Sequence, residues 1–215
     1  MVRIKICCVS SIDEARVAVQ HGASAIGLVS AMPSGPGPIA ETLIAEIART
    51  VPPGIASFLL TCKSTADEVI AQQKRCGTNT LQLVDEVEPG TYESLRTALP
   101  GISIVQVIHV IDESSISEAI AAAAGADALL LDSGRPKAAI KELGGTGRVH
   151  NWEISRAIAD TLTIPVYLAG GLNAGNVRAA IDVVRPFGVD ICSGVRTNGN
   201  LDTAKLATFM NEARS

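Results

Sequence analysis

Aromatic residues are scarce in this chain of 215 residues, where Phe, Trp and Tyr together account for 3%. Hydrophobic residues nevertheless account for 47%, so a buried core has to be built from Val, Ile, Leu and Ala. These are the residues that line buried parallel strands, and they favour an α/β protein over a β-sandwich. The length suits one barrel of alternating strands and helices better than two ordinary domains.

Clusters of positive charge and ordered cysteine spacings are also missing. The formal net charge is -4, and the lysines and arginines are scattered, so the chain has no electrostatic footprint for a nucleic acid. The five cysteines are odd in number and follow no Cys-x-x-Cys spacing, which argues against a disulfide framework and against a zinc site. We therefore expect a small-molecule partner, a reducing compartment and no metal.

No apolar run is long enough to cross a membrane. The most apolar interior stretch, residues 119–131, is interrupted by Asp127, and no basic segment followed by an apolar run opens the chain. We expect a cytoplasmic protein that binds neither a membrane nor a nucleic acid and is a monomer or a homodimer.

Eight short apolar runs, each typical of a buried strand, alternate with segments of helical periodicity. The runs are residues 2–7, 23–29, 55–60, 80–84, 102–110, 126–131, 164–168 and 189–192. The helical segments are residues 12–21, 39–50, 65–75, 92–99, 114–124, 152–161, 174–184 and 202–214, of which 92–99 has the weakest pattern.

Parallel strands need crossovers of this length, so eight such units predict a single-domain (β/α)8 TIM barrel over residues 1–215. The alternative is an open doubly wound sheet. That fold would need a glycine fingerprint after the first strand, where the chain has Cys7-Cys8-Val9-Ser10 instead.

Two reactive side chains stand where predicted strands give way to loops. Cys7 ends the first apolar run, and Asp132 follows the run that ends at Leu131. In a (β/α)8 barrel the carboxyl ends of the strands form the catalytic face. A free cysteine is more often a core residue, but a carboxylate directly after an apolar run is costly to bury unpaired, so Asp132 either caps a turn or faces a site.

Three glycine-bearing segments follow the late strands, at residues 144–147, 169–173 and 192–195. Loops after the last two strands of such barrels commonly bind phosphate, because glycine lets backbone N–H groups approach the anion. The alternative is that these are ordinary tight turns. The residues expected to present their amides to a phosphate are Gly145, Gly170, Gly171, Ser193 and Gly194.

Taken together, these motifs resemble the phosphoribosylanthranilate isomerase family. The resemblance rests on Lys5-Ile6-Cys7, Leu130-Leu131-Asp132-Ser133, Gly144-Gly145-Thr146-Gly147 with Trp152, Leu168-Ala169-Gly170-Gly171-Leu172 with Asn176-Val177, and Val189-Asp190 with Ser193-Gly194-Val195. It implies a (β/α)8 barrel that carries out, in tryptophan biosynthesis, an Amadori rearrangement of N-(5-phosphoribosyl)anthranilate, a phosphorylated aminosugar, to the 1-deoxyribulose 5-phosphate product. The resemblance implies no metal and no organic cofactor. It also implies that Asp132 is the general acid and Cys7 the general base, with Lys5 able to assist the thiolate if strand alternation is unbroken.

The chain departs from the family pattern at four places. Cys8 stands where the family usually has glycine, and Ser34-Gly35-Pro36 replaces a Ser-Pro-Arg whose arginine binds the anthranilate carboxylate. Val84 replaces a histidine, and Arg196 replaces a glutamate.

A replacement guanidinium for that carboxylate could come from Arg196 or Arg135, because a carboxylate is best bound by a bidentate fork. The alternative is that both are surface arginines. Of the histidines, only His109 could reach the site, and a hydrogen-bonded structural role is the more usual one for such a residue. Three functions stay open: the tryptophan-pathway isomerase, a relative with a changed aglycone, and a sugar-phosphate-binding barrel without turnover.

Overall fold

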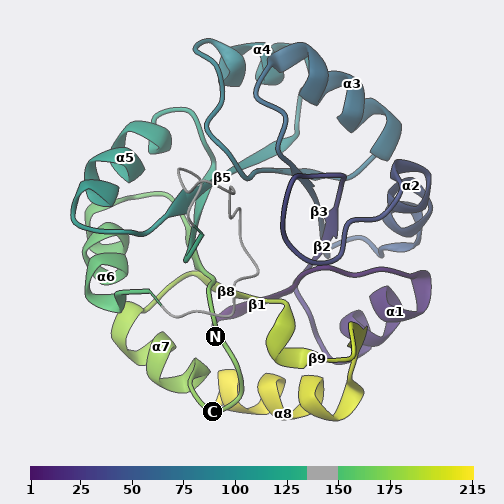
Figure 1. The fold of residues 1–215 in the computed structure, drawn as a ribbon, viewed down its shortest axis with the longest axis vertical. Coiled ribbons are helices and arrows are strands. Elements are labelled where there is room, and N and C mark those ends of the chain that lie inside the picture. Colours follow the sequence, from purple (N-terminus) through teal and green to yellow (C-terminus); the bar gives the residue numbers. More distant parts are fainter. Residues whose placement is uncertain (135–149) are drawn as a thin grey trace.

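Eight parallel strands close into a barrel in the computed structural model, which describes residues 1–134 and 150–215 (Figure 1). Each strand pairs with its neighbours in chain order, and β8 pairs with β1 to close the ring. The strands are β1 (Arg3–Ile6), β2 (Ala25–Val29), β3 (Ala56–Thr61), β4 (Thr80–Leu83), β5 (Ser103–His109), β6 (Ala128–Asp132), β7 (Val166–Leu168) and β8 (Gly188–Ile191). The closed barrel confirms the predicted fold and excludes the open sheet.

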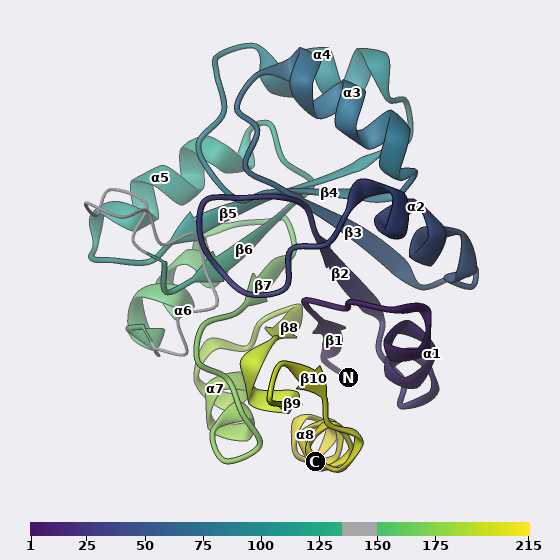
Figure 2. The same ribbon diagram turned by 45° about the vertical axis from the view of Figure 1, so that its right-hand side comes forward.

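Helices surround this barrel on all sides, as Figures 1 and 2 show. In the described ranges they are α1 (Ile12–Gln20), α2 (Glu41–Thr50), α3 (Ala66–Cys76), α4 (Thr91–Ala98), α5 (Ser114–Ala123), α6 (Trp152–Thr161), α7 (Val177–Val184) and α8 (Thr203–Arg214). The segment with the weakest pattern is therefore a helix as well. None of these helices has both the length and the apolarity that a membrane span requires.

Two apolar layers result from the alternation of side chains along each strand. In β6, Leu129 and Leu131 point outward into the larger core between strands and helices. Ala128 and Leu130 point inward and pack with inward residues of the other strands. Asp132 follows in the same inward series, so the strand itself aims its carboxyl into the barrel.

A short segment after β8 was not predicted. It consists of a 3-10 turn, η1 (Ser193–Val195), and a hairpin of two strands, β9 (Arg196–Thr197) and β10 (Asn200–Leu201). The hairpin turns through Asn198 and Gly199, both with positive φ. Two-residue strands are too short to produce a periodic pattern in the sequence, which is why only the structure reveals them.

Candidate active site

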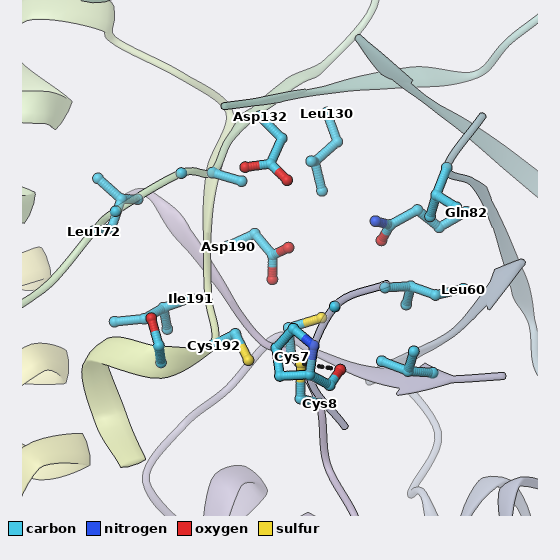
Figure 3. A pocket seen from close by; sticks show the side chains of 18 of the residues that line it. Cys7, Cys8, Leu60, Gln82, Leu130, Asp132, Leu172, Asp190, Ile191 and Cys192 are labelled. Carbon is cyan, nitrogen blue, oxygen red and sulfur yellow. Dashed lines mark hydrogen bonds between the residues drawn. The ribbon is translucent and has the colours of Figure 1, made fainter. Parts of the chain in front are cut away.

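A cavity opens at the carboxyl ends of the strands, where the predicted catalytic face lies (Figure 3). Its apolar wall includes Val29, Met32, Leu60, Val84 and Leu130. Its polar lining includes Cys7, Cys8, Gln82, Asp132, Asp190 and Ser193. Among the described residues that line it there is no arginine, lysine or histidine, so its immediate surface carries thiol, amide and carboxyl groups.

Lys5 in β1 and Cys7 directly after it both point into the barrel, and a glycine on the neighbouring strand makes room for both. A β-carbon at Gly27 would lie 2.8 Å from Sγ of Cys7 and 3.0 Å from Nζ of Lys5. Strand alternation is therefore unbroken, and the ammonium lies directly beneath the thiol. Lys5 is fully buried, and it stacks over the ring of Phe58 at 5.2 Å from the centroid.

Asp190 is the partner of the buried ammonium. Its Oδ1 lies 2.9 Å from Nζ of Lys5, and the two residues face each other across the β1–β8 seam. Burial lowers the pKa of Lys5, but the negative charges of Asp190 and Cys7 outweigh this effect and raise it above its usual range. Burial also raises the pKa of Asp190, against the attraction of Lys5. The ammonium consequently stays charged next to the thiol.

The pKa of the Cys7 thiol is lowered. Hydrogen bonding by the adjacent Cys8 thiol is the main cause, and the charge of Lys5 adds to it, while burial and Asp190 act in the opposite direction. Cys8 itself keeps its proton, because contact with Cys192 and Cys7 and burial raise its pKa far above the usual range. Of these two neighbouring thiols, Cys7 is therefore the one whose pKa is lowered, which is the direction that a general base needs.

The pKa of Asp132 is shifted in the opposite direction to that of Cys7. Burial raises the pKa of its carboxyl, and the Ser133 N–H, which donates to Oδ1 at 2.7 Å, only partly opposes this. His109 also opposes it, through its charge. A carboxyl that retains its proton can act as a general acid. In Figure 3 the carboxyls of Asp132 and Asp190 both point into the cavity, with Cys7 on its other side.

The loops after β7 and β8 carry four of the residues that the sequence assigned to an anion site. Gly170 and Gly171, with φ of 84° and 65°, line the cavity, and so does Ser193. Gly194 lies behind this lining, since a β-carbon there would be 2.3 Å from the carbonyl oxygen of Leu172. The glycine thus allows the two loops to pack together. Gly145 and the rest of residues 144–147 lie outside the described residues.

Arg196 does not reach the cavity. Its guanidinium lies under the β1–α1 loop, where it forms an ion pair with Glu14 at 3.0 Å and donates to backbone carbonyl oxygens. Its Nη groups are therefore already engaged by the protein. Arg135, the other guanidinium expected from the sequence, lies outside the described residues.

Two polar residues of the site were not predicted to act in it. Asp190 lies inside the short β8, and Gln82 points into the cavity from β4 with its Oε1 buried and unpartnered in the described part of the chain. A charged or amide side chain within a run of apolar strand residues is the signal that could have singled out both. His109, by contrast, uses its Nε2 on the carbonyl oxygen of Val84, at 3.1 Å, and does not line the cavity.

Comparison with known proteins gives one consistent result. The family model for N-(5'-phosphoribosyl)anthranilate isomerase matches residues 4–212. The N-(5'-phosphoribosyl)anthranilate isomerase of Methanocella arvoryzae is 33% identical, over 100% of this chain and 99% of its own. The N-(5'-phosphoribosyl)anthranilate isomerase 2 of Methanosarcina mazei is 35% identical, over 99% of this chain and 94% of its own.

Solved structures agree with these relatives. The phosphoribosyl anthranilate isomerase of Thermotoga maritima superposes with a TM-score of 0.83 at 29% identity, covering 100% of this chain and 99% of that one. Another phosphoribosyl anthranilate isomerase, in complex with reduced 1-(o-carboxyphenylamino)-1-deoxyribulose 5-phosphate, superposes with a TM-score of 0.80 at 27% identity over the same shares. The barrel and its strand order are therefore those of these enzymes.

Proposed function

Because this chain belongs to the N-(5'-phosphoribosyl)anthranilate isomerase family, we propose that it converts N-(5'-phosphoribosyl)anthranilate into the 1-(o-carboxyphenylamino)-1-deoxyribulose 5-phosphate by an Amadori rearrangement, as a step of tryptophan biosynthesis. One observation carries the proposal. A thiol with a lowered pKa, Cys7, and a carboxyl with a raised pKa, Asp132, line the same cavity. An acid–base isomerisation requires such a pair, because its base must have lost a proton while its acid still holds one.

The substrate is the phosphoribosylanthranilate expected from the sequence, but the term aminosugar is too loose for it. The relative in complex holds a compound in which the amine carries a carboxyphenyl group. The substrate we propose is accordingly an N-aryl glycosylamine. An apolar cavity wall of Val29, Met32 and Leu60 suits an aromatic ring of this kind.

Asp132 and Cys7 each carry out one proton transfer in the proposed reaction. Asp132 gives its proton to the ring oxygen, the bond from that oxygen to C1' breaks, and the nitrogen lone pair forms an iminium. The Cys7 thiolate then removes the proton from C2', and the electron pair moves to neutralise the iminium as an enolamine. Tautomerisation of the enolamine gives the ketose. The nearby Lys5 ammonium stabilises the thiolate before the transfer.

The phosphate of the substrate is assigned to the loops after β7 and β8. In the described part of the chain, no protein acceptor takes the N–H groups of Gly171, Ser193 or Gly194. In the loop after β7, the side chain of Asn176 donates to the carbonyl oxygen of Gly171 at 3.0 Å. Free amides on glycine-rich loops suit a phosphate dianion. Gly145 and Gly170 remain assigned to the same anion site.

A second candidate function is isomerisation of a glycosylamine with a different aglycone. The described lining of the cavity holds no cation that could bind the anthranilate carboxylate, and this observation favours it. Arg135 remains assigned as the carboxylate ligand in the first candidate. A cytoplasmic location and a monomeric or homodimeric state belong to the same proposal.

Genetic rescue separates the two candidates. Expression in a tryptophan auxotroph that lacks this isomerase should restore growth without tryptophan, and a chain carrying Asp132→Asn should not. If the wild-type chain is expressed and folded but growth is not restored, the changed aglycone becomes the better assignment. Retention of both catalytic side chains argues against a barrel that only binds sugar phosphates.

A further inference from the structure

Arg196 and Glu14 form a buried ion pair beneath the loop that carries Cys7, with side chains 8% and 12% exposed. Nη1 of Arg196 lies 3.0 Å from Oε1 of Glu14, and Nη2 lies 3.1 Å from Oε2. Glu14 also accepts the N–H of Ser10 at 2.9 Å and that of Leu201 at 2.8 Å. A bidentate pair fixed in this way has a defined position, unlike an exposed one.

The same guanidinium holds the backbone of both cysteines. Nη2 of Arg196 donates to the carbonyl oxygen of Cys8 at 2.5 Å and to that of Cys7 at 3.3 Å. Nη1 donates to the carbonyl oxygen of Gly199 at 2.9 Å, which ties the β9–β10 hairpin into the same contact. One side chain from the loop after β8 therefore bonds to the residue that carries the thiol and to the residue after it.

Cys8 is in a conformation that needs such support. Its φ is 60°, in the left-handed region that residues with a β-carbon adopt at a cost in free energy. The loop after β2 restrains it from the other side, because a β-carbon at Gly37 would lie 2.6 Å from Cβ of Cys8. Its Sγ lies 3.5 Å from the carbonyl oxygen of Pro36. Strained backbone of this kind persists only where its surroundings over-determine it.

We propose that Arg196, held by Glu14, is a positioning residue for Cys7: by bonding to the carbonyl groups of Cys7 and Cys8 it keeps the left-handed turn and aims the thiol into the cavity. The proposal rests on the proposed isomerase function, in which Cys7 acts as the base. Two of the departures from the family pattern, Cys8 and Arg196, are then linked, because the arginine restrains the backbone that the non-glycine residue strains. The carboxylate that Arg196 binds belongs to the protein.

Arg196→Gln tests the proposal through two readouts. One is the kcat and KM for N-(5'-phosphoribosyl)anthranilate. The other is the rate at which iodoacetamide alkylates Cys7 in the free protein at one pH near neutrality, followed by mass spectrometry of the Cys7 peptide. We expect kcat to fall about 10²-fold with a smaller change in KM, since a misplacement of about 1 Å can cost that much. Alkylation of Cys7 should slow by more than about threefold, because the thiol leaves the neighbours that stabilise its thiolate.

One control variant and one substitute variant complete the test. Arg178→Gln breaks an exposed ion pair with Asp182 on α7 and should change neither readout. Arg196→Lys replaces Arg196→Gln if the latter does not fold.

The strain can be tested by repeating Arg196→Gln in a Cys8→Gly background. Glycine adopts the left-handed conformation without penalty, so the loss of kcat caused by Arg196→Gln should be several-fold smaller there. An equal loss in both backgrounds overturns the link to Cys8. A folded Arg196→Gln variant with wild-type kcat and wild-type alkylation of Cys7 overturns the whole proposal. If the wild type itself does not turn over the substrate, the proposed function fails, and alkylation alone decides whether Arg196 positions the thiol.

Discussion

Lys5 and Asp190 form an ion pair across the seam where the barrel closes, with Nζ of Lys5 2.9 Å from Oδ1 of Asp190. They come from the first and last strands, so the pair exists only in the closed barrel. Both side chains are buried, at 0% and 8% exposure. The ammonium lies beneath Cys7. Closure of the barrel therefore fixes the positive charge that favours the thiolate form of Cys7.

Removing the ammonium should damage both stability and reactivity. Lys5→Met leaves the Asp190 carboxylate buried without its partner, which should lower the free energy of unfolding by about 3–5 kcal/mol. It should also raise the pKa of Cys7 and slow its alkylation near neutrality. Denaturant unfolding measures the first effect. Lys63→Met, which breaks the exposed pair with Glu68, is the matched control and should lower the free energy of unfolding far less. Equal losses from the two variants would contradict this account.

The pH dependence of kcat/KM should be bell-shaped. Activity needs Cys7 without its proton and Asp132 with its proton, so it rises with pH as the thiol ionises and falls as the carboxyl ionises. The lowered pKa of Cys7 and the raised pKa of Asp132 bring the two ionisations closer together and increase the competent fraction. In Asp132→Asn the residual activity should therefore rise with pH and not fall on the alkaline side. An alkaline fall that persists in this variant would assign the descending limb to another group.

Gly27 should be intolerant of a side chain. The β-carbon of Gly27→Ala would lie 2.8 Å from Sγ of Cys7, so the thiol has to move. We expect kcat to fall by at least about 10-fold, with a smaller change in KM. Gly54→Ala is the control, because its β-carbon meets no atom within 4 Å and only its positive φ is penalised. It should lower stability and leave kcat unchanged. Wild-type kcat in Gly27→Ala would show that the thiol does not depend on this space.

The assignment of the phosphate site predicts a substrate-dependent effect. Gly171→Val places a branched side chain at a φ of 65° on the cavity wall, which should raise KM for the phosphorylated substrate. The dephosphorylated substrate should show little difference between wild type and variant. Inorganic phosphate should inhibit the wild type and compete less well in the variant. If KM changes equally for both substrates, the loop does not bind the phosphate.

The barrel could be predicted from the sequence because each of its strands is buried on both faces and reads as an apolar run. The same pattern gave the positions of Cys7 and Asp132, since a reactive residue at the end of such a run has to lie at the rim of the barrel. The structure places both in one cavity. The strand ends shifted slightly; β7, for example, begins at Val166, after Pro165, which has no N–H for the ladder.

The partners of charged residues could not be predicted in the same way. Lys5 and Asp190 each interrupt an apolar run, but their pairing depends on the closure of the barrel. From the sequence alone, Arg196 could be either a surface arginine or a ligand-binding one. Its role depends on the position of Glu14 in the folded chain, which the sequence pattern does not give. Glu14 has two roles in the structure, because its N–H bonds to Ser11 Oγ at 3.1 Å at the start of α1 while its carboxylate binds Arg196.

Turnover of N-(5'-phosphoribosyl)anthranilate by the purified protein tests the central claim most directly. The wild type should consume it and form the 1-deoxyribulose product, while Cys7→Ser and Asp132→Asn should each lower kcat by at least about 10²-fold with little change in KM, as expected for loss of a positioned base or acid. A folded wild-type protein without turnover would contradict the proposed reaction, and near-normal kcat in Cys7→Ser would contradict the role of the thiol.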